Sequence, residues 1–271
     1  MSAFERPDAD AEVIESIEQF TSMWRVFVTD RGNADVTDTV GLAIRWTDNA
    51  FPFWNMVFLT QQLASLEALV GYLQEAAAYM RTKKALGFLY VCEEFLGASA
   101  LEFLPTAVSQ AGFEFAFPVH GMAGDFLPIE PPSHRSLRFA RVTTEDDLQS
   151  YADLNSSGYG FPLEAGRAGL AGSTLWKMAV HSYLGYENGV PVSAAATVAN
   201  NGCLFLALVA TMLAAQRKGY GEATVRQALF AGARETGLTR TVLHATDAGF
   251  PVYRRIGYHK VCTIQAYKLQ A

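Results

Sequence analysis

Residues 181–210 have the pattern of three consecutive strands joined by two tight turns. Apolar runs at 181–186, 190–198 and 203–210 are separated by Glu187-Asn188-Gly189 and Asn200-Asn201-Gly202. An Asn-Gly pair between apolar runs favours a β-hairpin, because tight hairpin turns need residues that tolerate positive φ. The segment therefore predicts an antiparallel meander.

Helices and strands alternate after this meander. The periodicity predicts a helix over 221–236, a strand over 241–245, a helix over 249–256 and a last strand over 260–268. Upstream, 137–141 has strand character, and Thr143-Thr144 followed by three acids is typical of a helix start, with the helix running to about Ser156. The predicted class is α/β (α+β), with a mixed, mostly antiparallel sheet flanked by helices.

The N-terminal half repeats part of this order. Strands are expected at 24–28, 39–46, 54–60 and 86–91, helices at 63–82 and 98–110, and extended chain from Phe113. Both halves end in a helix, a glycine flanked by Phe113 or Tyr258, and a strand. We interpret this as two copies of one fold. Pro131-Pro132 within 130–136 suits a linker, which gives domains 1–130 and 131–271.

Composition limits the function classes. Half of the 271 residues are hydrophobic and 18% are charged, which argues against disorder. The polar, acidic N-terminus does not resemble a secretory signal, and charges or glycines interrupt every apolar stretch, so we expect a cytoplasmic protein with no membrane span. Cys92, Cys203 and Cys262 are scattered singly and are expected to be buried free thiols. Because neither CxxC nor a cluster of His, Cys and carboxylate residues at the spacing of metal ligands is present, no metal site is predicted.

The charge is distributed unevenly. Residues 1–130 hold 18 Asp and Glu against 7 Lys and Arg, and residues 131–271 hold 9 against 14. The halves therefore have opposite net charge, which suits either two electrostatic roles or mutual attraction. No basic stripe with interleaved aromatic residues is present, so nucleic acid is not an expected partner.

The segment 208–222 has the strongest chemical signal. A strand ending Val209-Ala210-Thr211 leads through a short loop to Gln216-x-x-Gly219-x-Gly221, which opens the long helix. Glycines at a helix start let backbone N–H groups converge on an anion, and the helix dipole favours negative charge there. A Rossmann loop would need a third glycine and a later acid, and a Walker loop would need Gly-Lys-Ser/Thr; neither pattern fits.

This segment resembles motif A of the GNAT superfamily of N-acetyltransferases. A second motif of that family matches downstream at Thr246, Tyr253, Gly257 and Tyr258. The resemblance extends over about residues 137–270, and it implies an acyltransferase that uses acetyl-CoA as its co-substrate.

The resemblance assigns roles to individual residues. It places the pyrophosphate of acetyl-CoA on the backbone amides of Arg217–Glu222 and the pantetheine arm along an exposed strand edge. It makes Tyr253 the catalytic acid that protonates the leaving thiolate. The cofactor-binding residues that it implies are Leu208, Val209, Thr211, Gln216, Arg217, Lys218, Gly219, Tyr220, Gly221, Glu222 and Thr246. A simple helix cap is the alternative for Thr246, and core packing is the alternative for Tyr253.

The general base is left open among His181, Glu187, His244 and Asp247, with ordered water as a further option. In the N-terminal half, Gln61-Gln62-Leu63-Ala64-Ser65 stands where a glycine loop would be, and Val108 stands in the place of Tyr253. This half is expected not to bind acetyl-CoA but to brace the other half or complete the acceptor pocket. Residues 49–55 could line that pocket or pack in the core, and 156–175 could form a lid or a connector.

The expected reaction is acetylation of a primary amine of a small molecule by direct attack. The acidic N-terminal half favours a cationic acceptor such as an aminoglycoside. The alternatives are another acyl group, a protein amine as acceptor, or a non-catalytic acetyl-CoA sensor. The sequence does not indicate the oligomeric state.

Overall fold

The computed structural model describes residues 9–125 and 132–270. The first two residues of the expected linker, Glu130 and Pro131, and the first eight residues of the chain lie outside these ranges. The helices are α1 (Ala9–Thr29), α2 (Leu66–Arg81), α3 (Ala98–Gln110), α4 (Glu145–Tyr159), α5 (Leu163–Leu170), α6 (Thr174–Met178), α7 (Tyr220–Thr236) and α8 (Phe250–Ile256). The strands are β1 (Asp35–Asp38), β2 (Leu42–Trp46), β3 (Asn55–Leu59), β4 (Phe88–Cys92), β5 (Phe113–Gly124), β6 (Arg138–Arg141), β7 (His181–Glu187), β8 (Val190–Asn200), β9 (Cys203–Thr211), β10 (Thr241–Ala245) and β11 (His259–Leu269).

All of these strands belong to one continuous sheet. Their order is β1-β2-β3-β4-β11-β5-β10-β9-β8-β7-β6, and only the β3–β4 and β9–β10 pairs are parallel. The expected mixed, mostly antiparallel sheet is confirmed, and so is the meander, which forms β7, β8 and β9.

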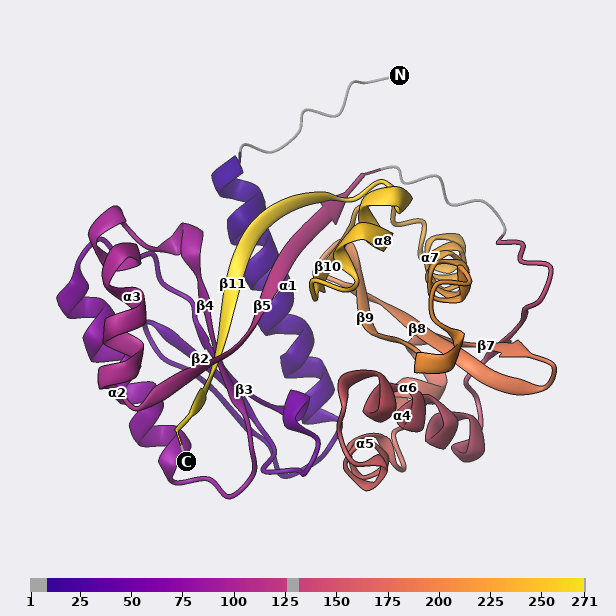
Figure 1. The fold of residues 1–271 in the computed structure, drawn as a ribbon, viewed down its shortest axis with the longest axis horizontal. Coiled ribbons are helices and arrows are strands. Elements are labelled where there is room, and N and C mark those ends of the chain that lie inside the picture. Colours follow the sequence, from indigo (N-terminus) through magenta and orange to yellow (C-terminus); the bar gives the residue numbers. More distant parts are fainter. Residues whose placement is uncertain (1–8, 126–131, 271) are drawn as a thin grey trace.

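The two halves of the chain exchange their last strands at the centre of the sheet. β11, the last strand of the chain, pairs with β4 of the N-terminal half, and β5 pairs with β10 of the C-terminal half. β5 and β11 also pair with each other, and Figure 1 shows them side by side through the middle of the molecule. A strand from each half therefore completes the hydrogen bonding of the other half.

Helices cover both faces of this sheet. Helix α1 and the helices α4 and α6 share one apolar core with residues of β3, β4, β9 and β11. On the opposite face, α2 and α3 cover the N-terminal strands, and α7 and α8 cover the C-terminal strands. The parallel pairs β3–β4 and β9–β10 are each connected by one of these helices, α2 and α7 respectively.

The strand expected at 24–28 is wrong, because these residues form the end of α1. The buried residues of α1 recur at helical spacing, and this pattern outweighs the strand propensity of the Val-Phe-Val run at 26–28. They are Val13, Ile17, Phe20, Trp24 and Phe27. The expected strand at 39–46 is shorter, and a turn separates β1 from β2.

Helix α1 also carries polar contacts to both halves. The Arg45 guanidinium of β2 donates to the Thr21 carbonyl at 3.0 Å, and the Gln19 amide donates to the Asn200 carbonyl in the β8–β9 turn at 3.1 Å. Arg240 pairs with Glu12 and Glu15 of the helix. These ion pairs join the acidic half to the basic half, as expected if the two halves attract each other. None of the helices among the described residues is long and apolar enough to cross a membrane.

Gly121 of β5 lies where α1, β5 and β11 meet. A Cβ atom at this position would lie 2.3 Å from Cys262 Sγ and 2.6 Å from Ser16 Oγ. We therefore expect Gly121→Ala to lower the free energy of unfolding by about 1–3 kcal/mol, because the three elements must move apart. Urea titration measures the change.

Gly71→Ala in α2 is the matched control. A Cβ atom there meets nothing within 4 Å. The alanine should raise the free energy of unfolding by about 0.5–1 kcal/mol, since glycine costs backbone entropy in a helix. Equal effects of the two substitutions would contradict the close packing assigned to Gly121.

Candidate active site

Strands β9 and β10 part midway along their length. Their parallel pairing ends at Leu206 and Leu243, after which β10 continues to pair only with β5. The remainder of β9, from Ala207 to Thr211, therefore has a free edge on the β10 side. This opening was expected from the resemblance, and two pockets adjoin it.

A bulge in β9 marks the same place. Leu208 has a φ of +44°, and the register between β8 and β9 shifts opposite Ala195. The Leu208 carbonyl accepts a hydrogen bond from the Tyr151 hydroxyl at 2.8 Å, and the Val209 carbonyl accepts one from Tyr159 at 3.0 Å. Two tyrosines of α4 thus replace the strand partner of these carbonyls and hold the bulge in position.

Residues 216–222, the glycine loop, present a run of unpaired backbone donors. Among residues 9–125 and 132–270, none of the backbone N–H groups from Arg217 to Glu222 has a hydrogen-bond acceptor. Gly219 has a φ of +82° and Arg217 a φ of +62°, and these left-handed residues turn the chain into α7. A Cβ atom at Gly221 would lie 2.6 Å from Thr211 Oγ1, so the start of α7 fits against β9 only without a side chain there. The loop has the form of an anion site.

Several charged side chains surround the glycine loop. Lys218 pairs with Glu187 at 3.6 Å, and Glu187 also accepts a hydrogen bond from the Tyr220 hydroxyl, which lowers the pKa of that carboxyl. Glu222 pairs with Arg226 and Arg255. Most of the nearby positive charge is therefore partly neutralised by the protein, which leaves the backbone amides as the main anion donors.

A pocket of about 380 Å³, the loop pocket, lies between the glycine loop, the end of β9 and α8. The sequence-predicted residues that line it are Val209, Thr211, Gln216, Arg217, Gly219, Tyr220, Gly221, Glu222, Thr246 and Tyr253. Lys218 is outside the lining, and Leu208 lines the neighbouring pocket instead. The structure thus brings nearly all of these residues together around one cavity, and their binding roles remain predictions.

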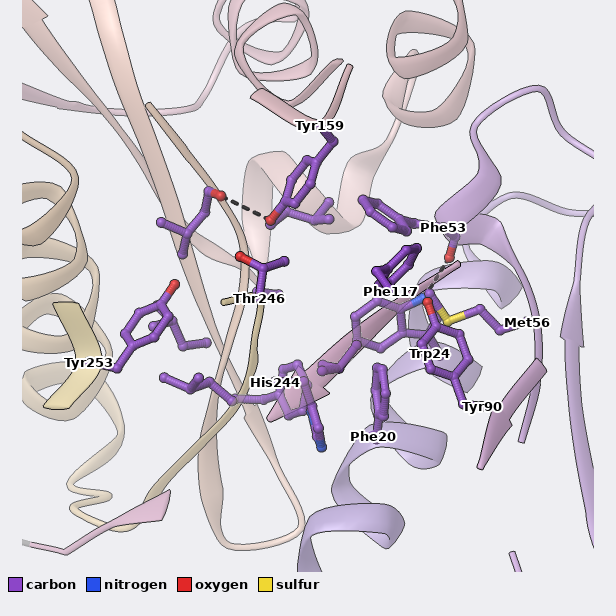
Figure 2. Close-up of a pocket in the computed structure, with 17 residues that line it drawn as sticks. Phe20, Trp24, Phe53, Met56, Tyr90, Phe117, Tyr159, His244, Thr246 and Tyr253 are labelled. Carbon is purple, nitrogen blue, oxygen red and sulfur yellow. Dashed lines mark hydrogen bonds between the residues drawn. The ribbon is translucent and has the colours of Figure 1, made fainter. Parts of the chain in front are cut away.

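The neighbouring pocket, the aromatic pocket, has a volume of about 70 Å³ and lies between the two halves. Figure 2 shows it between α1 and β10, with Tyr253 on one side and Tyr90 on the other. Its N-terminal-half lining consists of Phe20, Trp24, Phe53, Met56, Tyr90, Phe117 and Val119. The two pockets share Tyr159, Val209, His244, Thr246 and Tyr253, so they adjoin at the point where β9 and β10 part.

Tyr253 and Thr246 stand at this junction. The Tyr253 ring is 7% exposed, and burial raises the pKa of its hydroxyl well above the ordinary value. Its hydroxyl has no hydrogen-bond partner within the described part of the chain. Thr246 Oγ1 accepts from the Gly249 backbone N–H at 3.3 Å, so Thr246 both supports the first turn of α8 and lines the pockets. Both alternatives considered for Thr246 are therefore compatible with its position.

Only His244 of the four candidate bases lines a pocket. His181 packs against α7 beside Glu235, and Glu187 contacts the glycine loop. Asp247 is exposed and pairs with His120 at 2.7 Å. Among the candidates, His244 alone is placed to face a substrate.

His244 is held by the N-terminal half. Its ring stacks on Phe20 with centroids 3.8 Å apart, and its Nε2 shares a hydrogen bond with Ser16 Oγ at 3.0 Å. Its Nδ1 is buried with no partner among the described residues. Burial lowers the pKa of His244 to about 3, and the contact with Ser16 opposes this shift only in part. The imidazole is therefore neutral at physiological pH.

Two expectations about flanking segments are met only in part. Phe53 of residues 49–55 lines the aromatic pocket, whereas Phe51 and Trp54 are fully buried in the core. Of residues 156–175, Gly158 and Tyr159 at the end of α4 line the pockets, and the remainder includes α5 and the start of α6. The Trp54 indole donates to the Gly169 carbonyl at 2.7 Å, so this segment packs on the N-terminal half.

The corresponding opening in the N-terminal half is closed by its own chain. Leu63 forms a bridge with Leu96 where β3 and β4 end, and its N–H donates to the Phe95 carbonyl at 2.7 Å. Ser65 caps α2 with its side chain, and Val108 is buried in the core. The absence of a phosphate cradle in this half remains a prediction.

The three cysteines are free and buried, as expected. Two of them are nevertheless close in space, because β4 and β11 pair. Ligand atoms of Cys92, Cys262 and Glu94 lie within 4.8 Å of one another. The sequence spacing gave no sign of this cluster, since it depends on the exchange of β11 into the other half.

Sequence reasoning did not identify the aromatic residues of α1, Tyr90 or Tyr159 as site residues. The helical spacing of Phe20 and Trp24 was the available signal. This spacing predicts a helix with one apolar face toward the interior, but it does not predict that the helix lies beside β10.

We expect His244 to make stability depend on pH. Its pKa is about 3 when folded and about 6.5 when unfolded, so the unfolded chain binds a proton first as the pH falls. Stability should therefore decline from about pH 6.5 toward pH 3. Between pH 7 and 4.5 the loss due to this residue should be about 2 kcal/mol.

Urea titrations of the wild type and His244→Phe at pH 7 and 4.5 measure this contribution. The variant keeps an aromatic ring against Phe20 but cannot be protonated. Its stability should fall by about 2 kcal/mol less than that of the wild type over this range. Parallel pH profiles would show that His244 is not kept neutral by burial.

Comparisons with known proteins identify the fold. No protein-family model matches the sequence, and no curated protein matches it significantly. Among solved structures, a GCN5-related N-acetyltransferase from Kribbella flavida has a TM-score of 0.64 at 16% identity, covering 93% of this chain and 95% of its own.

Two further structures agree. A GCN5-related N-acetyltransferase from Sphaerobacter thermophilus has a TM-score of 0.59 at 12% identity, covering 84% of this chain and 76% of its own. A GCN5-related N-acetyltransferase-like protein from Streptococcus suis has a TM-score of 0.56 at 15% identity, covering 96% of this chain and 99% of its own. The chain therefore has the fold of the GCN5-related N-acetyltransferases.

Proposed function

We propose that this protein is an acetyl-CoA-dependent N-acetyltransferase that acts on a primary amine of a small molecule by direct attack. The observation that carries this proposal is the run of unpaired backbone N–H groups from Arg217 to Glu222, which opens onto a pocket of about 380 Å³ beside a free strand edge. The fold of the structural neighbours supports the same activity class.

The residues present fit acetyl-CoA. A pyrophosphate needs several converging donors, and the glycine loop supplies them at the positive end of the α7 dipole. The free edge of β9 can pair with an extended chain that carries amide groups, as a sheet edge pairs with a peptide. The bound co-substrate would supply an acetyl thioester, whose carbonyl carbon is open to attack by an amine.

Tyr253 is the residue that we assign to the leaving group. Because burial keeps its hydroxyl protonated at neutral pH, it can donate to the sulfur as the carbon–sulfur bond breaks. Its position at the junction of the two pockets suits this role. The amine nitrogen forms the new bond to the acetyl carbon and loses its proton to water, since burial makes His244 a weak base and the described lining of the aromatic pocket offers no carboxylate.

We further propose that the N-terminal half, residues 1–130, is a second copy of the fold that has lost its co-substrate site. The matching positions of the parallel pairs β3–β4 and β9–β10 support this proposal. Its role would be to complete the acceptor pocket of the half formed by residues 131–271 with α1, β3, β4 and β5. A cytoplasmic location remains a prediction.

A non-catalytic acetyl-CoA sensor is the second candidate. It would need the same glycine loop but not the donor at Tyr253. Tyr253→Phe therefore separates the two functions, because it removes one hydroxyl and leaves the ring in place.

Binding of acetyl-CoA, measured by calorimetry, should be at least tenfold weaker in Gly219→Glu than in the wild type, a loss of about 1.4 kcal/mol or more. The new carboxylate would repel the phosphates at the glycine loop. Gly237→Glu is the matched control, because Gly237 lies at the other end of α7 with a similar φ of +74°. Equal loss in both variants, or no binding to the wild type, would refute the assigned cradle.

Turnover tests the catalytic assignment. Tyr253→Phe should lower kcat by about 10- to 100-fold while leaving the Kd for acetyl-CoA unchanged. Thiol release in the presence of an accepted amine measures kcat. An unchanged kcat would remove Tyr253 from the mechanism, and the absence of turnover with any amine despite tight binding would favour the sensor.

A further inference from the structure

The aromatic pocket is built to hold an uncharged ring. Within the described residues, His244 is the only member of its lining that could carry a positive charge, and no Asp or Glu contributes to it. Burial lowers the pKa of His244 to about 3, and burial raises the pKa of Tyr159 to about 12. Tyr90 and Tyr253 also have raised pKa values. All titratable groups of the pocket are therefore neutral near pH 7.

An ammonium group would be poorly stabilised there. Taking an ammonium ion out of water costs several kcal/mol unless a counter-charge and hydrogen bonds replace the water. Aromatic faces can bind cations, but Phe20 at the centre of the lining already packs against other rings of the pocket. Phe20 stacks on His244 and meets Trp24 and Tyr90 edge to face. The acidic residues of the N-terminal half favoured a cationic acceptor on sequence grounds, but none of those that the structure describes lines this pocket.

Rings from the two halves also meet beside the pocket. The half-buried Phe53 lies edge to face against Tyr159 at 4.9 Å and Phe161 at 5.2 Å, so the N-terminal and C-terminal halves meet there through rings. The volume of about 70 Å³ is below the roughly 150 Å³ of an apolar cavity that holds benzene. A single ring can therefore enter only if the pocket widens, for example by a change of the flexible Met56 side chain, and a second ring has no room.

The Tyr90 hydroxyl lies on the side of the pocket away from Tyr253. The Tyr90 side chain is 3% exposed, and its hydroxyl has no hydrogen-bond partner within the part of the chain that the structure describes. Figure 2 shows Tyr90 across the pocket from Tyr253 and Thr246, with His244 and Phe20 between them. A bound molecule thus meets hydroxyl groups at both ends and apolar rings along its length.

We propose that the acceptor is a compact arylamine of one ring, which binds as the uncharged free base with its amino group toward Thr246 and Tyr253. An arylamine suits the site because its nitrogen lone pair is delocalised into the ring, so it is unprotonated at neutral pH and needs no general base before attack. This inference rests on the proposed acetyl transfer and names the substrate class for it. The amine nitrogen bonds to the acetyl carbon, the thiolate leaves, and the proton of the amine passes to water.

Two isomeric amines test the proposal. 4-Methylaniline and benzylamine have the same atoms and the same ring, but benzylamine is an alkylamine and is mostly protonated at pH 7, as a lysine side chain is. In calorimetric titrations of the full chain at pH 7, 4-methylaniline should bind at least thirtyfold more tightly. Raising the pH from 7 to 8 should tighten benzylamine binding about tenfold, through its free-base fraction, and leave 4-methylaniline unchanged.

Phe53→Asp and Phe53→Leu form a matched pair of variants. Phe53 lines the pocket and is half-buried, so a carboxylate at this position can remain hydrated. The aspartate should reduce the preference for 4-methylaniline at least tenfold, because it supplies the missing counter-charge, and the leucine should retain the preference. Circular dichroism establishes that both variants are folded, and the comparison of amines on the wild type stands without them.

The outcomes separate this inference from the proposed function. Tighter binding or faster acetylation of benzylamine, or of the polycation kanamycin, at pH 7 would overturn the arylamine assignment while acetyl transfer stands. Failure of 4-methylaniline to bind a protein that binds acetyl-CoA would also overturn it. Absence of acetyl-CoA binding would instead overturn the transferase on which the inference rests.

Discussion

The parting of β9 and β10 after Leu206 and Leu243 is the constraint on which the site depends. It leaves the end of β9 without a partner, and it separates the glycine loop from α8 by enough space for a pocket. A sheet that opens in this way would expose backbone polar groups and apolar side chains on both sides. Tyr151 and Tyr159 donate hydrogen bonds to two of the exposed backbone carbonyls. Aromatic residues of the other half pack beside the opening and line the pocket there.

Helix α1 provides most of that filling. Its apolar residues occupy the face of the sheet beneath the opening, while Ser16 and Gln19 contact β10 and the β8–β9 turn. Ser16 also fixes the orientation of His244, the only candidate base beside the pockets. The aromatic pocket is thus shaped by a helix that belongs to the opposite end of the sequence.

The parts of the fold that depend on local pattern could be predicted from the sequence. The hairpins at Asn188-Gly189 and Asn201-Gly202 and the glycine loop at 216–222 were found, because turns and helix starts are set by a few neighbouring residues. Helix α1 was missed, since Val26, Phe27 and Val28 suggested a strand while the spacing of Val13, Ile17, Phe20 and Trp24 was the deciding signal. The exchange of β5 and β11 has no local signal at all.

The same division holds for the site. Nearly all the residues expected around the co-substrate line one pocket, because a loop and the strand before it are contiguous in the chain. The aromatic pocket could not be predicted, since Phe20, Phe53 and Tyr90 come from three separate elements. Net charge alone does not locate a binding site, because acidic residues of α1 are paired with Arg240 and His259.

The central position of β11 has a consequence for the order in which the chain can fold. Cys92 of β4 pairs opposite Ile264, so the N-terminal half cannot complete its sheet until the last strand has been synthesised. During synthesis, β4 presents a hydrophobic strand edge of the kind that associates with other chains. The pairing of β4 with β11 joins residues that lie far apart in the sequence, and contacts that close such long loops form slowly. The edge of β4 therefore stays exposed in the newly made chain until residues 259–269 have been synthesised and have paired with it.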